Sequence, residues 1–480
     1  MAQRDDTGRR RTLGTDQAWA ALDGDPGLTE RISYTKPPGL LAARLPAMDL
    51  ARATVAACAL AAAELAAARD GGPLRAVRVD DGAVATAFVS ERHLRIDGRA
   101  PSTFAPLSRF WRASDGWLRT HANYPHHRAR LLRTLGLPDT AEPADVEAVI
   151  AGLRAEEVED AVYAAGGLAI AARTPEEWSA HPQGTAVARH PLLTRETLGS
   201  GAPPRSLPAR AGDPVLPAAG LRVLDLTRVI AGPVATRTLA LLGADVLRID
   251  APQLPESQDA HRDTGFGKHS AALDLGSPSG RASFEALLAE ADVVVTGYRP
   301  GALDRFGLAP EALAERRPGL VVARLSAWGD DGPWGGRRGF DSVVQVATGI
   351  AAIEADGAGT PGALPAQVLD HGTGYLLAAA VLRALTEQSR TGGSHLATLA
   401  LARTARWLVH DLGNKSELPT HEGATAPAPS PGYDPDRYLR ETDSPVGRLR
   451  HALPPVTFDS GPVNWTAPPG RCGSDAPVWR

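Results

Sequence analysis

The chain has 480 residues, enough for two to four domains with a sizeable buried core. Its 51 Lys and Arg against 55 Asp and Glu give a formal charge of −4, so it lacks the net basic field that nucleic-acid binding requires. Only Cys58 and Cys472 occur, which excludes a disulfide framework and a cysteine-rich metal site and fits a reducing cytoplasm.

Residues 1–35 are polar and weakly patterned, and no apolar run follows their charged start, which is not typical of a signal peptide. Residues 36–200 are predicted to hold a long helix. The helix, over about 45–65, is rich in alanine, and Arg52 and Glu64 interrupt it. We therefore expect a buried helix of a cytoplasmic protein and not a membrane span.

Residues 201–218 are rich in Pro, Gly, Ala and Arg, which predicts a linker. Residues 219–412 then alternate short apolar runs with helical stretches, and the predicted strands are LRVLDL, ADVLRID, ADVVVTG and LVVARLSA. This alternation is typical of an α/β fold with a doubly wound, Rossmann-like parallel sheet. The first turn reads TRVIAGPVAT and lacks GxGxxG, which argues against a nicotinamide dinucleotide site.

Two long stretches share their features, LPAMDLARATVAACALAAAEL at 45–65 and LPAQVLDHGTGYLLAAAVLRAL at 364–385. Each has an aspartate, Asp49 or Asp370, ahead of a long Ala-rich helix and a glycine-bearing turn. The similarity predicts an internal repeat, although two unrelated Ala-rich helices would look alike. Residues 413–435 are predicted to be a second linker, and 436–480 a C-terminal segment that packs back on the body.

Five blocks within residues 219–412 carry a resemblance to a known family. They are VLDLTRVIAGPVATRTLALLGADVLRID, KHSAALDLGSPSGR, ADVVVTGYRPGALDRFGL, LVVARLSAWGDDGPWGGRRGFDSVVQVATG and LDHGTG. In order and spacing they resemble the class III CoA-transferase family, which also contains acyl-CoA racemases. PLSRFWRASDGWLRTHANYPHHRARLLRTLGL resembles the family's small domain, yet it precedes the other half here. The resemblance implies the CoA-transferase III fold, with a smaller α+β domain within residues 36–200. It also implies that the halves are permuted or that the chain is a shortened fusion of two copies, and that the protein is a homodimer.

The resemblance places the catalytic carboxylate on Asp370. A carboxylate can attack an acyl-CoA thioester, and a position near a helix N-terminus would favour its ionised form. The alternative is that Asp370 only caps the helix, and His371 is an alternative acid–base group. Gly372 and Gly374 would let the substrate approach closely. Asp49 has no such glycines after it and is expected to serve only as a helix cap.

The same resemblance implies the residues that contact CoA. They are Arg305 and Arg338 for the phosphates, Gly297 and Tyr298 along the path from adenine to pantetheine, and Arg228 in the first turn. For each arginine the alternative is a solvated surface charge. Asp341 would order the site unless it pairs with Arg337 or Arg338. The chain departs from the family at Ile230, where a polar residue is common, and at Ala251, where a basic one is common.

The leading hypothesis is therefore a CoA-transferase that moves CoA between an acyl-CoA and a carboxylic acid through an aspartyl anhydride and an enzyme thioester. It would have acyl-CoA as substrate, no permanently bound cofactor, no metal, and no nucleic-acid or membrane partner. A racemase of the same family needs a His before the Asp of the GxD element, where Phe340 stands. A catalytically degenerate CoA-binding homologue is a second alternative, which Ile230 and Ala251 keep open.

Overall fold

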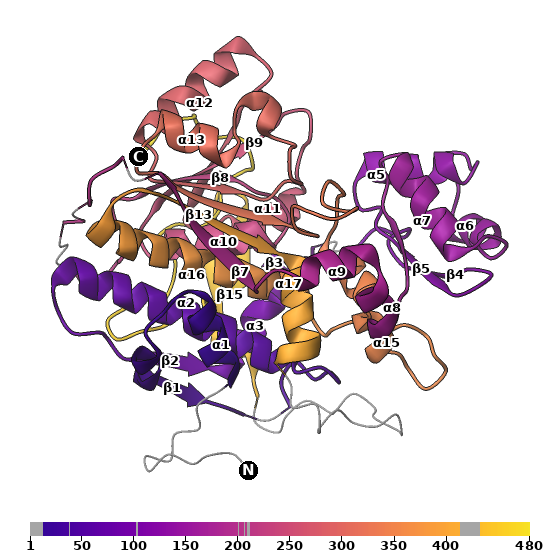
Figure 1. Cartoon of the computed structure of the whole chain (residues 1–480), viewed down its shortest axis with the longest axis horizontal. Coiled ribbons are helices and arrows are strands. Elements are labelled where there is room, and N and C mark those ends of the chain that lie inside the picture. Colours follow the sequence, from indigo (N-terminus) through magenta and orange to yellow (C-terminus); the bar gives the residue numbers. More distant parts are fainter. Residues whose placement is uncertain are drawn as a thin grey trace.

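The structure of the chain is a computed structural model. It describes residues 13–37, 39–101, 104–199, 201–205, 207–208, 212–412 and 433–480. Figure 1 shows a large layered body and a smaller group of helices and strands that projects from one side. Of the predicted segments, residues 1–12, 413–432 and parts of 201–218 lie outside the described residues.

A seven-stranded sheet forms the centre of the body. Its order is β10 (Lys268–Ala272), β9 (Asp245–Asp250), β8 (Arg222–Leu226), β11 (Val293–Thr296), β12 (Val321–Ser326), β13 (Ser394–Ala400) and β7 (Leu193–Gly199). The first six strands are parallel, and β7 pairs antiparallel with β13 at the edge. Counted along the chain from β8, the parallel strands run 3-2-1-4-5-6, so the predicted doubly wound sheet is confirmed.

Both faces of the sheet are covered, as the nearly continuous apolar strands require. In β11, Val293 and Val295 belong to one core with α10 (Ala231–Leu241) and α16 (Val368–Thr391). Val294 between them belongs to a second core with α12 (Pro278–Glu290) and α13 (Pro310–Arg316). Successive side chains of a strand point to opposite faces, so one valine run serves two helical layers, which Figure 1 shows above and below the sheet.

Helix α2 (Ala47–Asp70) lies against α16, and both contain 24 residues. Both helices contain many buried alanines, whose small side chains allow close packing, and α1 (Leu13–Ala21) contacts α2. Among the described residues, α2 alone is long and apolar enough to cross a membrane by length and composition, but 94% of its apolar window is buried inside the protein. The prediction of a buried helix is confirmed.

The projecting group is a small α+β domain, called here the small region, residues 105–171. It contains the antiparallel strands β4 (Phe110–Arg112), β5 (Trp117–Thr120) and β6 (Ala169–Ala171) and the helices α5 (Pro125–Thr134), α6 (Pro143–Ile150) and α7 (Ala155–Ala164). Trp111, Leu118 and Leu132 belong to a separate apolar core. The predicted α/β fold with a smaller α+β domain is therefore confirmed, whereas the predicted domain boundaries stay predictions.

Short elements complete the body. The remaining strands are β1 (Ile32–Thr35) with β2 (Val77–Asp80), which are parallel, and the antiparallel set β14 (Leu439–Ser444), β15 (Gly447–Ala452) and β3 (Arg95–Ile96). The remaining α-helices are α3 (Asp81–Phe88), α4 (Ser90–His93), α8 (Pro175–Ala180), α9 (Pro182–Ala188), α11 (Gln258–Thr264), α14 (Asp341–Ala347), α15 (Ile350–Ile353) and α17 (Leu401–Arg406). Beyond β15 the chain returns over the body, where Phe458 bridges to Val77 and Ser474 to Ala271. Cys58 and Cys472 are both free.

Candidate active site

A cavity of about 1060 Å³ lies where the parallel strands end and the small region begins. The segments that follow β8, β9, β10, β11 and β12 all contribute to its wall, and α5 of the small region contributes another side. In a doubly wound sheet, ligands bind outside the carboxyl ends of the strands, at the point where the strand order reverses. The cavity occupies this position between β8 and β11.

Asp370 reaches this cavity from the first turn of α16. The residue is 6% exposed. The N-cap position of α16 is Gln367 and Asp370 is the third residue of the helix, so Asp370 is not its N-cap. The charged groups that act on it are the carboxylates of Asp341 and Glu91, and no basic side chain in the described part of the chain pairs with it. The helix thus presents a desolvated, unpaired carboxyl group to the cavity.

Asp341 holds the backbone at that point. It is fully buried at the start of α14, and its Oδ2 accepts the backbone N–H of Asp370 at 2.9 Å. Its other carboxylate oxygen accepts a hydrogen bond from Gln345. Arg337 and Arg338, the alternative partners of Asp341, bind groups of the small region instead. Asp341 is therefore placed as a supporting carboxylate that fixes the first turn of α16.

The two carboxyl groups, Asp370 and Asp341, both have raised pKa values. Burial raises the pKa of Asp370 well above its usual value, and the negative charges of Asp341 and then Glu91 raise it further. Burial also raises the pKa of Asp341 to about 6, against the hydrogen bonds from the backbone of Asp370 and from Gln345, which lower it. The N-terminus of α16 favours the ionised form. Ionisation of Asp370 therefore leaves a carboxylate that is poorly solvated and has no basic partner in the described part of the chain.

His371 lies behind this pair. Its ring stacks on Phe88 with centroids 5.2 Å apart, and its Nε2 lies 3.9 Å from Oε2 of Glu91. The residue is 1% exposed and is not among the described residues that line the cavity. The geometry does not place His371 as an acid–base group for a ligand in the cavity.

The charged lining of the cavity is strongly unbalanced. Seven arginines but only two aspartates line it, among the described residues; the arginines are Arg130, Arg228, Arg281, Arg299, Arg305, Arg337 and Arg338. Arg337 pairs with Glu159 and Asp160 of the small region. Arg228 also pairs with a glutamate. The remaining five arginines form no ion pair with a carboxylate in the described ranges; Arg305, for example, lies over the ring of Phe306 at 4.6 Å. Such a wall suits a polyanionic ligand.

Arg228 differs from the other predicted CoA contacts, because a carboxylate of the protein already neutralises its charge. Its Nε lies 3.3 Å from Oε2 of Glu256, which is buried, and its guanidinium stacks over Tyr124. Glu256 also accepts the backbone N–H of Val229, whose φ of +71° is unusual for a β-branched residue. The Arg228–Glu256 pair therefore shapes the first turn and leaves little charge for a phosphate.

The remaining predicted contacts have different surroundings. Gly297 and Tyr298 both line the cavity, and burial raises the pKa of the Tyr298 hydroxyl. Of the two departures from the family, Ala251 lines the cavity, whereas Ile230 packs against the main core at the start of α10.

Gly372 and Gly374 have a different role from the predicted one. A Cβ on Gly372 would lie 2.4 Å from Leu50 of α2, and one on Gly374 would lie 2.5 Å from the carbonyl oxygen of Ala231 of α10. Neither glycine is among the described residues that line the cavity. They let α16 pack closely on its two neighbouring helices and do not open a path for substrate.

The segment around α2 repeats the local structure around α16. The parallel strands β1 and β2 flank α2 in sequence, as the parallel strands β12 and β13 flank α16. Asp49 and Asp370 are each the third residue of their helix, and the residue before each helix has a φ of −75°. The shared geometry favours the internal repeat over two unrelated helices.

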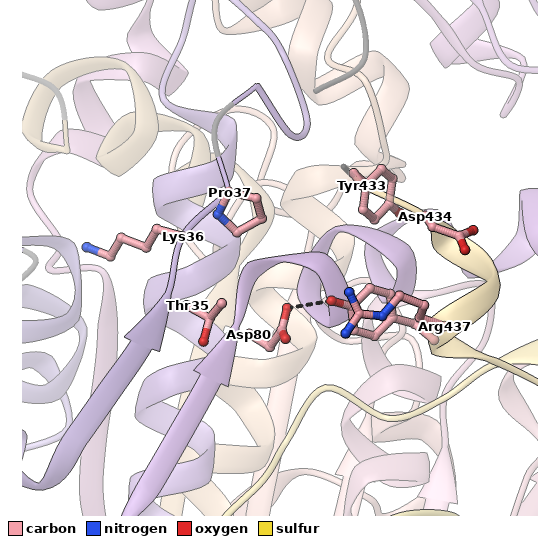
Figure 2. A pocket seen from close by; sticks show the side chains of 8 residues that line it. Thr35, Lys36, Pro37, Asp80, Tyr433, Asp434 and Arg437 are labelled. Carbon is pink, nitrogen blue, oxygen red and sulfur yellow. Dashed lines mark hydrogen bonds between the residues drawn. The ribbon is translucent and has the colours of Figure 1, made fainter. Parts of the chain in front are cut away.

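The chemistry around α2 is different. Asp49 does not cap its helix, contrary to the prediction; its half-exposed carboxylate pairs with Arg52, which also binds the buried Asp81. A cavity of about 360 Å³ lies at the ends of β1 and β2, and Figure 2 shows its lining side chains. There Asp80 accepts a hydrogen bond from the Tyr438 hydroxyl at 2.9 Å. The carboxylates of this unit are thus engaged in structural contacts.

Arg130, Arg281 and Arg299 also line the cavity, but they were not among the residues predicted from the sequence. Arg299 lies inside the block ADVVVTGYRPGALDRFGL, only six positions before Arg305, and could have been chosen on that ground. Arg130 lies almost 100 residues before Leu226, the end of β8, and no local pattern distinguishes it from the other arginines of α5. Only the docking of the small region brings it to the cavity.

Comparison with known proteins gives one family match. A family model described as CoA-transferase family III matches residues 5–200 and 218–437. An acetyl-coenzyme A transferase of Hypoxylon pulicicidum is 34% identical over 216 residues, 44% of this chain and 36% of that protein. A probable fatty acyl-CoA transferase of Mycobacterium tuberculosis is 35% identical over 202 residues, 39% and 51% of the two chains. An acyl-CoA transferase of Gibberella moniliformis is 31% identical over 359 residues, 66% and 62%.

The chain therefore spans less than two thirds of the length of each of these relatives. Among solved structures, that of a hypothetical protein from Mycobacterium tuberculosis is 35% identical, with a TM-score of 0.39, over 40% of this chain and 56% of that one.

Proposed function

Because the chain belongs to CoA-transferase family III, we propose that it is an enzyme that moves CoA from an acyl-CoA thioester to a carboxylic acid, with Asp370 as the nucleophile. The observation that carries the proposal is the position of Asp370, a buried carboxyl group without a basic partner, in a cavity lined by arginines. The family resemblance inferred from the sequence is thus confirmed, and the activity is proposed.

The proposed reaction has two matched halves. Ionised Asp370 attacks the thioester carbonyl carbon and forms an acyl–aspartyl anhydride, which releases CoA thiolate. The thiolate attacks the aspartyl carbonyl, which gives an aspartyl–CoA thioester and frees the first acid. The second acid attacks that thioester and forms a new anhydride, and the released thiolate takes the new acyl group. CoA leaves on the second acid, and Asp370 is regenerated as a carboxylate.

The charge of the cavity supports CoA as the ligand. CoA carries a pyrophosphate and a 3′-phosphate, together about four negative charges at neutral pH. Arg305 and Arg338, the two arginines predicted for the phosphates, both line the cavity and keep their charge unpaired. Together with Arg130, Arg281 and Arg299 they give five unpaired guanidinium groups among the described lining residues, an appropriate number for such a ligand.

Asp341 supports the nucleophile in two ways. It fixes the backbone of Asp370 through the 2.9 Å hydrogen bond, so the reacting carboxyl group stays aimed at the cavity. Its own negative charge also disfavours the ionised state of Asp370 in the empty site, so the ionised nucleophile is a high-energy state.

Incubation of the purified protein with labelled acetyl-CoA or succinyl-CoA and a panel of acids tests the proposal. Appearance of label on the CoA ester of a second acid supports it. Exchange of the α-hydrogen of a 2-methylacyl-CoA with D₂O, without transfer, would instead indicate a racemase. Binding of CoA without either reaction would indicate a catalytically degenerate homologue. No transfer with any donor and acid would contradict the proposed function.

A further inference from the structure

Two arginines from different parts of the chain meet at one carbonyl group in the wall of the large cavity. Arg130 of α5 and Arg338, which precedes α14, each donate from Nη1 to the carbonyl oxygen of Gly166, at 2.8 and 3.0 Å. Arg130 and Gly166 belong to the small region, whereas Arg338 follows β12 of the large sheet. Two guanidinium groups thus lie close together with a single neutral oxygen as their shared acceptor.

This arrangement lacks a counter-charge. Neither arginine pairs with a carboxylate in the part of the chain that the structure describes; their shared partner is the Gly166 carbonyl. Burial lowers the pKa of Arg338, and the positive charges of Arg299 and then Arg130 lower it further. Like charges held together in a partly buried place repel each other, so an anion beside them would be favourable.

Gly166 keeps the place open. Its φ is +75°, in the left-handed region that favours glycine. A Cβ at this position would lie 3.3 Å from Nη1 of Arg130 and 3.4 Å from Nη1 of Arg338. Both arginines line the cavity that contains Asp370, so an anion bound by them would belong to the ligand that reaches Asp370.

We propose that Arg130 and Arg338 form a phosphate site that one phosphate group of CoA occupies, and that the bound phosphate fastens the small region to the large sheet. This inference rests on the proposed function for the identity of the ligand. It adds a residue of the small region to the CoA site, and it makes ligand binding a link between the two parts of the chain. The phosphate belongs either to the pyrophosphate or to the ribose 3′-phosphate, which share this chemistry.

Calorimetric titration of the full chain with CoA and with 3′-dephospho-CoA tests the site. The variants are Arg130→Gln, which removes the charge, and Arg130→Lys, which keeps it. Arg133→Gln is the matched control, since Arg133 is an exposed arginine of the same helix and is not among the described cavity-lining residues. Hydrogen exchange of the α5 amides, with and without CoA, measures whether the ligand fastens the small region.

Arg130→Gln is expected to weaken CoA binding about tenfold or more, Arg130→Lys to recover most of the loss, and Arg133→Gln to bind like the wild type. If Arg130→Gln weakens CoA but leaves dephospho-CoA unchanged, the 3′-phosphate is the ligand; equal losses indicate the pyrophosphate. CoA is also expected to slow exchange in α5 of the wild type and not of Arg130→Gln.

Wild-type affinity for CoA in Arg130→Gln, with correct folding shown by circular dichroism, would overturn the inference. A wild-type protein that binds no CoA would also overturn the inference. Hydrogen exchange in α5 that CoA does not slow would do the same. A protein that binds CoA through Arg130 but transfers it to no acid would contradict the proposed function and leave the phosphate site supported.

Discussion

The units around α16 and α2 have the same local fold but opposite electrostatic environments. Asp370 is buried, without a basic partner, and faces a cavity of about 1060 Å³ with arginine-lined walls. Asp49, at the same position of its helix, is half exposed and pairs with Arg52. Arg52 also pairs with the buried Asp81. The cavity at the ends of β1 and β2 has a volume of about 360 Å³, and Asp80 in its wall caps α3.

The comparison indicates that strand–helix–strand geometry alone does not make a reactive carboxylate. A nearby cation stabilises the ionised form and quenches its reactivity, whereas burial without a partner leaves it reactive. The predictions below test this difference, beginning with the largest expected effect.

Asp370→Asn is expected to lower kcat by about a thousandfold or more, because an amide cannot act as the nucleophile. CoA binding should change little, since the arginines that surround the ligand remain. Steady-state kinetics and calorimetry on the same preparation measure the two quantities. Turnover close to that of the wild type would contradict the anhydride mechanism.

Arg305→Ala and Arg338→Ala are each expected to raise KM for the CoA donor about 10- to 100-fold, the loss of one charge-assisted contact. Arg228→Ala should behave differently. It removes the nearer of two arginines from the buried Glu256, which keeps Arg248 at 3.9 Å and the Tyr124 hydroxyl, so it should lower the free energy of unfolding by about 1.5–3 kcal/mol. Kinetics and urea unfolding separate the two effects. Unchanged donor KM in both Arg305→Ala and Arg338→Ala would place CoA elsewhere.

The raised pKa values of Asp370 and Asp341 predict how activity and stability depend on pH. Transfer needs ionised Asp370, so its rate should rise with pH through the raised pKa of Asp370 and fall as the pH drops below that pKa. A carboxyl group whose pKa is higher in the folded state favours folding when protonated, and that stability is lost as pH rises through the folded-state pKa.

Removal of this carboxyl group should therefore stabilise the protein at alkaline pH. We expect Asp370→Asn to unfold at a higher temperature than the wild type at pH 8, with a smaller difference at pH 5. Thermal unfolding followed by circular dichroism gives both values. A variant less stable than the wild type at pH 8 would mean that Asp370 is stabilised by a partner.

Asp49→Asn is expected to have the smallest effect, because Asp49 is 54% exposed and its pair with Arg52 is partly screened. The free energy of unfolding should fall by at most about 1 kcal/mol, and transfer should continue at the wild-type rate. Urea unfolding and kinetics measure the two. Loss of transfer in a folded Asp49→Asn protein would assign the reaction to the other carboxylate.

Much of the fold could be predicted from the sequence, because its signals are local. Val293–Thr296 is a continuous apolar run, as a strand covered on both faces must be, and the long Ala-rich stretch at 45–65 predicted the buried helix α2. The addition of β7 to the sheet could not be predicted, since it depends on antiparallel pairing with β13, about 200 residues away in sequence.

The residues of the candidate site also fall into two groups, those predicted from local motifs and those whose role depends on contacts with distant segments. Asp370, Arg305 and Arg338 follow from motifs and lie at one cavity. The role of Gly372 could not be predicted, because it depends on contact with Leu50 of α2, and the use of Arg228 depends on Glu256. These contacts join segments that are separated in the sequence, so the residues around one position do not identify its contact partner.

The most direct test of the central claim is to trap the covalent intermediate. Hydroxylamine added during turnover with acetyl-CoA and a second acid cleaves an aspartyl anhydride or thioester and leaves a hydroxamate on the carboxylate that carried it. Peptide mass spectrometry then locates the modified residue. The hydroxamate is expected on Asp370 and on no other described carboxylate, with none on Asp49. A hydroxamate on Asp49, or none in a protein that is transferring CoA, would contradict the assignment of Asp370 as the nucleophile.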